Sequence, residues 1–181
     1  MNRALQIAWA CVFALGLATG CRKYRTREFV AAQHPVKFEN WRLYVNAFVD
    51  AANPSPTNHL YLISAVAWTA PGDSIGPDAS QFRPTAYDAS LDSLRLFRIE
   101  GTNAVELPLP PLGHGSTDHP NHLVRLAPSN RAGIEIPASV RELRADIVMT
   151  FQHRDTGKTE TRVFTVTMLK RERAKLEPLL E

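Results

Sequence analysis

The feature that most constrains this chain is a side-chain alternation near its carboxyl end. One set of alternate positions is apolar throughout: Ala145, Ile147, Met149 and Phe151. A period of two places such a set on one face of a β-strand. The segment 154–158 then offers Gly157, which tolerates positive φ. The same period returns on Phe164, Val166 and Met168. We therefore expect a β-hairpin with one buried face.

Similar patterns predict short strands along most of residues 37–169. The expected strands are 41–49, 60–68, 90–100, 104–107, 123–126 and 133–136, in addition to the hairpin. Segment 60–68 is apolar nearly throughout, which is typical of a central strand. The apolar side changes at Leu96–Phe97, which predicts a β-bulge. Outside the two ends of the chain we expect no helix of core length, so the predicted fold class is all-β.

Seven to eight short strands separated by turns favour an antiparallel β-sandwich over residues 37–169. The strand spacing resembles that of the immunoglobulin-like sandwiches common in bacterial envelope lipoproteins. This resemblance implies a scaffold, and it assigns no catalytic residues because it rests on strand spacing alone. The loops at 70–84 and 108–122 are the expected contact regions, since long loops on a rigid scaffold often carry binding.

An apolar run opens the chain and ends at a cysteine. Residues 4–18 are apolar except for Gln6, and Arg3 precedes them. A run of 15 residues fits the core of a signal peptide better than a spanning helix, which needs about 20. The sequence Leu17-Ala18-Thr19-Gly20-Cys21 resembles the lipobox of bacterial lipoproteins, with leucine one position earlier than usual. The resemblance implies a signal-peptide helix over 1–20, cleavage before Cys21 and lipidation of its thiol.

Alternatives to this anchor remain open. Cys11 is a rival lipid acceptor, although Trp9 lies close before it and little apolar sequence precedes it. Basic residues follow the apolar run, and the positive-inside rule would read them as the cytoplasmic flank of a signal anchor. A secreted domain without an anchor is a third interpretation. The lipoprotein interpretation places the chain in the bacterial cell envelope. In a Gram-negative cell it predicts the outer membrane, because Arg22 stands where some enteric bacteria use a retention aspartate.

Charged segments flank the expected sandwich. Residues 21–36 are rich in basic side chains and predict a tether that can touch anionic head groups. Residues 170–181 predict a charged tail or a short helix. The formal net charge is only +3 and the basic residues are scattered, so nucleic acid is not an expected partner. Two cysteines exclude a disulfide scaffold.

The loop 108–122 holds the residues most suggestive of chemistry. Four potential metal ligands lie within it: His114, Asp118, His119 and His122. Neutral imidazoles and carboxylates are suitable ligands, but this spacing matches no strong metal motif, so we expect a solvated loop. Ser116 between His114 and Asp118 does not predict a catalytic triad, because triads are assembled across a fold. The acid pairs Asp73/Asp78 and Asp88/Asp92 are not distinguished from surface acids.

These patterns predict a membrane-anchored, non-enzymatic structural or interaction module of the bacterial envelope. We expect no cofactor, and an envelope protein or polymer as partner. The alternative is a metal-binding or hydrolytic envelope protein that uses the 108–122 loop. Four large aromatic side chains are expected in the core rather than on a carbohydrate or peptide surface: Trp41, Tyr44, Tyr61 and Trp68.

Overall fold

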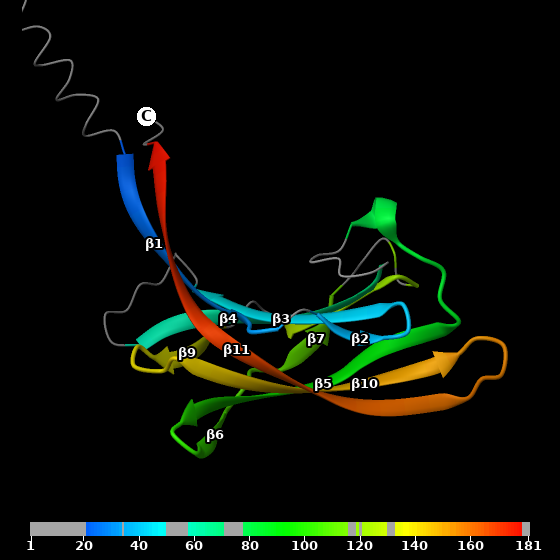
Figure 1. The fold of residues 1–181 in the computed structure, drawn as a ribbon. Helices are drawn as coiled ribbons and strands as arrows, with labels where there is room; N and C mark the ends of the chain where they lie inside the picture. Colours follow the sequence, from blue (N-terminus) through cyan, green and yellow to red (C-terminus); the bar gives the residue numbers. More distant parts are fainter. Residues whose placement is uncertain are drawn as a thin grey trace, which may run out of the picture. The chain divides into compact units, whose positions relative to one another are not determined.

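The fold is known from a computed structural model, which describes residues 21–33, 35–49, 58–70, 78–115, 119, 121–129 and 133–178 (Figure 1). The expected signal-peptide helix over 1–20 lies outside the described residues. In the described part, no helix is long and apolar enough to span a membrane. The elements are β1 (Cys21–Ala31), β2 (Val36–Phe38), β3 (Trp41–Val49), β4 (Asn58–Thr69), the single-turn 3₁₀ helix η1 (Ala79–Gln81), β5 (Tyr87–Glu100), β6 (Asn103–Leu107), β7 (Leu112–His114), β8 (Leu123–Pro128), β9 (Ile134–Pro137), β10 (Glu142–His153) and β11 (Thr159–Pro178).

The chain divides into two compact units. One unit is Arg27–Arg171, and the other combines Met1–Thr26 with Glu172–Glu181. In the second unit, the described residues are the first part of β1 and the last part of β11, which are neighbouring strands. The first unit contains the folded core and all the side-chain contacts discussed below.

Eleven strands form one sheet, with antiparallel pairing between neighbours such as β10 and β11 or β3 and β4. The order is β6-β5-β10-β11-β1-β3-β4-β8-β7, with β2 also pairing with β3 and β9 with β4. Figure 1 shows β3 and β4 in one layer and β5 and β10 in another. The sheet therefore turns its apolar face onto itself, which confirms the expected all-β, antiparallel class and is consistent with a sandwich.

The predicted hairpin forms as β10 and β11. Residue pairs run from Glu142–Leu169 to Gln152–Thr159, and Gly157 has a φ of 66° in the connecting turn. The turn between β5 and β6 places Gly101 at a φ of 62°. Both glycines occupy the left-handed region, where a side chain would be strained.

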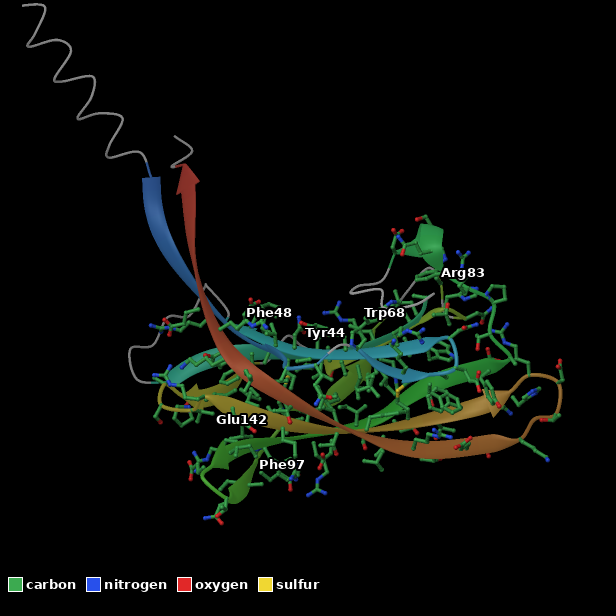
Figure 2. All side chains as sticks on the ribbon, in the orientation of Figure 1. Tyr44, Phe48, Trp68, Arg83, Phe97 and Glu142 are labelled. Carbon is green, nitrogen blue, oxygen red and sulfur yellow. The ribbon has the colours of Figure 1, made fainter. Side chains whose placement is uncertain are left out.

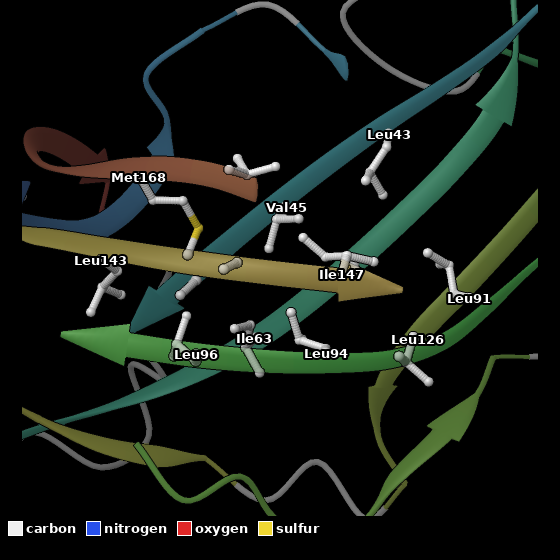
Figure 3. Packing of buried hydrophobic residues seen from close by; sticks show 14 of the residues in the cluster. Leu43, Val45, Ile63, Leu91, Leu94, Leu96, Leu126, Leu143, Ile147 and Met168 are labelled. Atoms are coloured by element: carbon white, nitrogen blue, oxygen red, sulfur yellow. The ribbon is translucent and has the colours of Figure 1, made fainter. Parts of the chain in front are cut away.

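The core lies between the two layers (Figure 3). The four alternate residues of β10 are all buried, and Figure 3 shows Ile147 of this row among core side chains of β3 and β4 such as Val45 and Ile63. At one end, the Phe151 ring lies 4.1 Å from the Phe38 ring, between centroids, and 6.3 Å from that of Phe164. Apolar burial of this kind supplies the main free energy that favours folding.

The predicted bulge at Leu96–Phe97 is wrong in position. The register between β10 and β5 shifts at Val148/Met149, opposite Leu91–Ser93, so the extra residue lies there. This shift lets Leu91 and Leu94 both point into the core. Phe97 is buried instead on the opposite face, where the guanidinium carbon of Arg144 lies 4.5 Å from its ring centroid.

The ends of the chain also differ from expectation. The tether predicted for 21–36 is wrong over Cys21–Ala31, which form β1, because Phe29 is fully buried and residues 28–30 pair with β3. The short helix considered for 170–181 is wrong as far as Pro178, where β11 continues beside β1. The expected loop 108–122 contains the short strand β7, which pairs with β8.

The packing predicts a large cost for truncating Phe151. Phe151→Ala should lower the free energy of unfolding by about 3–5 kcal/mol, because it leaves a cavity against Phe38 and Phe164. Val163→Ala is the matched control on the exposed face of β11, where Val163 is 66% exposed, and it should change stability by less than about 0.5 kcal/mol. Urea unfolding of each variant measures both values. Equal stability of the two variants would contradict this core.

Candidate functional site

Hydrogen bonds and ring contacts hold the histidine-containing loop in place. His114 lies exposed at the end of β7, opposite Leu126 of β8. His122 Nδ1 lies 2.9 Å from the Thr69 hydroxyl at the end of β4. The backbone N–H of His122 donates to the carbonyl of His119, at 2.9 Å. The rings of both His119 and His122 contact Phe82, with centroids 5.3 and 5.6 Å away.

These contacts give the loop a packing role. Phe82 follows η1, so the His122 imidazole joins that segment to the end of β4, while the His119 ring packs against Phe82. Asp118 and Ser116 lie outside the described residues. Among the residues that the structure does describe, no three His, Cys, Asp or Glu side chains are close enough together to hold a metal ion. The three described candidates, His114, His119 and His122, are therefore not brought together as a metal site.

The acidic side chains singled out in the sequence take part in local hydrogen bonds. Asp78 accepts bonds from the Ser80 hydroxyl at 2.7 Å and the Ser80 backbone N–H at 3.0 Å, and these bonds lower its pKa. Asp92 accepts from the Thr150 hydroxyl at 2.6 Å. Asp88 accepts from Arg154 Nε at 2.9 Å. Asp73 lies outside the described residues.

Three of the four large aromatic residues are buried as expected. Trp41, Tyr61 and Trp68 are each 1% exposed. The Trp41 indole N–H donates to the Tyr87 carbonyl at 3.2 Å, which links β3 to β5. Tyr44 is only half-buried, and Figure 2 labels it with Phe48 on the side of β3 that faces away from β5 and β10.

The same outer side carries a groove that the sequence did not predict. It has a volume of about 300 Å³ and lies over β3, β4 and β8. The residues that line it are mostly apolar: Phe48, Leu62, Ile63, Ser64, Arg125, Ala127 and Pro128. Phe48 is 41% exposed, an unusual position for a large aromatic side chain, and it pairs across the strands with Leu62.

Arg125 is the charged residue of this lining. Its Nε donates to the Ser64 hydroxyl at 3.2 Å, while the side chain as a whole remains exposed. Gly115 packs against the stem of Arg125: a Cβ on Gly115 would lie 3.1 Å from Arg125 Cδ. The Gly115 backbone N–H also donates to the Arg125 carbonyl at 2.9 Å. The guanidinium is thus held at the edge of an apolar groove.

A weak sequence signal for the groove was present. Phe48 falls in the outward set of the alternation along 41–49, among Arg42, Tyr44 and Asn46. A large apolar side chain on an outward strand face indicates either a binding surface or a contact with another part of the chain. The partners Ser64, Gly115 and Arg125 come from three other segments, and nothing in their local patterns connects them to Phe48.

Comparisons with protein-family models, curated proteins and solved structures found no match for this chain.

The packing role of His122 can be tested. His122→Ala should lower the free energy of unfolding by about 1 kcal/mol, because the Thr69 hydroxyl loses its partner and Phe82 loses a ring contact. His114→Ala, on the exposed edge strand β7, is the matched control and should leave stability nearly unchanged. Urea unfolding followed by tryptophan fluorescence measures both. A larger loss for His114→Ala would show that the loop is organised differently.

Proposed function

We propose that this chain is a membrane-anchored bacterial envelope lipoprotein whose β-domain is a non-enzymatic structural or interaction module. The observation that carries the proposal is the sequence Leu17-Ala18-Thr19-Gly20-Cys21, which ends a 15-residue apolar run. Small residues before the cysteine suit a peptidase that must bind an extended, unhindered backbone. The two or three acyl chains of a lipoprotein hold a protein firmly at a membrane, whereas a single chain does not.

The residues around the expected lipid are compatible with such an anchor. Cys21 lies in β1, so an acylated amino terminus would lead directly into a strand. The unit that contains Cys21 carries Arg22, Lys23 and Arg25 on β1, and Arg173 and Lys175 on the neighbouring β11. Basic residues near a membrane surface each contribute about 1 kcal/mol of attraction to anionic head groups. A basic unit that contains the expected lipid site supports a domain held close to a membrane.

We further propose that the unit Arg27–Arg171 is an immunoglobulin-like sandwich. Its support is the pair of facing layers, one with β3 and β4 and the other with β5 and β10, and the antiparallel pairing in both. Folds of this type expose end loops and outer faces as binding surfaces. The groove on the outer side of β3, β4 and β8 is such a surface, with a partly exposed Phe48 beside a cation. These exposed surfaces support an interaction with an envelope protein or polymer.

The anchor is tested by lipid labelling in cells. Cells that produce the wild-type chain are grown with radiolabelled palmitate and fractionated, in parallel with Cys21→Ala. We expect label on the wild-type chain in the membrane fraction and none on Cys21→Ala, since the thiol is the acceptor. The size of the wild-type chain should also fall by the mass of residues 1–20.

Cys11→Ala is the matched control, because Cys11 is the other cysteine of the chain. It should be labelled and processed like the wild type. Label that persists on Cys21→Ala but is lost on Cys11→Ala would move the anchor to Cys11. A wild-type chain that is unlabelled, unprocessed and retained in the membrane would contradict the lipoprotein and indicate a signal anchor.

A further inference from the structure

We propose that the groove over β3, β4 and β8 is a binding site for a single-chain amphipathic carboxylate of the fatty-acid type. Its lining combines an extended apolar surface with a guanidinium at one place. A ligand that matches both must carry an apolar chain and one anionic head. This inference goes beyond the proposed interaction with an envelope protein or polymer, because it assigns the groove a small ligand of stated chemical class.

The charge at the site favours an anion. Arg125 makes a hydrogen bond to the neutral Ser64 hydroxyl, and no carboxylate among the described residues forms an ion pair with it. A guanidinium has five N–H donors, and the bond to Ser64 uses the one on Nε. The two Nη groups are therefore the donors left for a ligand. Their planar arrangement matches the two oxygens of a carboxylate.

The guanidinium is positioned before any ligand arrives. Ser64 is 5% exposed and bonds Nε from the floor of the groove, while Gly115 packs against the stem of Arg125. Strand pairing between β4 and β8 fixes the backbone of both residues, since Ala65 pairs with Leu126. Holding a long side chain in its binding geometry lowers the entropy lost on association.

The apolar part of the groove selects the rest of the ligand. Phe48 and Leu62 lie side by side across β3 and β4, and Ala127 and Pro128 continue the surface on β8. Arg125 is the sole charged residue among the described residues that line the groove, so a single anionic head suffices. A volume of about 300 Å³ lies at the lower end of the range for small-molecule sites. A short, slender acyl chain fits these properties.

The test compares octanoate with octanamide, which has the same chain and no charge. Each is titrated into the full chain purified in a nonionic detergent, with detergent-only titrations subtracted, and binding is followed by calorimetry. We expect saturable 1:1 binding of octanoate and at least 10-fold weaker binding of octanamide. Acetate should not bind measurably, because it lacks the apolar chain. Absence of saturable octanoate binding, or equal affinity for the two eight-carbon ligands, would overturn the proposal.

Variants assign the effect to Arg125. Arg125→Gln should weaken octanoate at least 10-fold and leave octanamide unchanged, so that the two ligands become equivalent. Arg83→Gln is the matched control, because Arg83 is also exposed and is absent from the groove lining. It should bind octanoate like the wild type. Loss of octanoate binding in Arg83→Gln, or wild-type binding in Arg125→Gln, would contradict the assigned head-group site.

Two further measurements address a variant that fails to fold and a competing class of ligand. If Arg125→Gln does not fold, Gly115→Ala replaces it, and its shift of the Arg125 stem should weaken octanoate more than octanamide. An acetylated Leu-Phe dipeptide with a free carboxylate should bind more weakly than octanoate. Tighter binding of the dipeptide would assign the groove to peptide ends instead. These titrations do not involve Cys21, so their failure would leave the palmitate result standing, and the reverse also holds.

Discussion

The structure depends on the burial of one row of alternate side chains along β10 between the two layers. Ala145, Ile147, Met149 and Phe151 are each at most 1% exposed, and the strand pairs with both β5 and β11. A slip of one residue in either register would turn that row to solvent. The bulge opposite Val148/Met149 keeps Leu91 and Leu94 on the core side despite their odd spacing. The burial of this row therefore sets the register of the layer.

The outer faces of the two layers differ in how they treat an aromatic side chain. On β5 and β10, Arg144 covers Phe97, so an aromatic side chain that points away from the core is still buried. On β3, Phe48 remains 41% exposed beside a groove with Arg125 at its edge. The contrast is physical: a cation placed over a ring closes one surface, whereas the cation beside Phe48 bonds to Ser64 and leaves the aromatic surface open.

Several histidine and aspartate residues that were candidates for a chemical site make contacts that hold loops in place. His122 and Asp78 bond to neighbours that stabilise loop ends, and His119 packs with His122 against Phe82. Gly115, from the same histidine-containing stretch, matters because its missing side chain makes room for Arg125. In the described residues, the histidine-containing stretch therefore contributes packing and room for Arg125.

Elements with a local cause could be predicted from the sequence. Alternation along 145–151 and 164–168 predicted both strands of the hairpin, and Gly157 predicted a turn that needs positive φ. Features that depend on partner strands emerged only in the folded chain. β1 and β7 are strands because they pair with β3 and β8, although their own residues show little alternation. The groove unites Phe48, Ser64 and Arg125 with Gly115 behind them, and only strand pairing brings four such distant segments together. Periodicity reports which face a residue occupies, but it carries no information on which strand lies beside it.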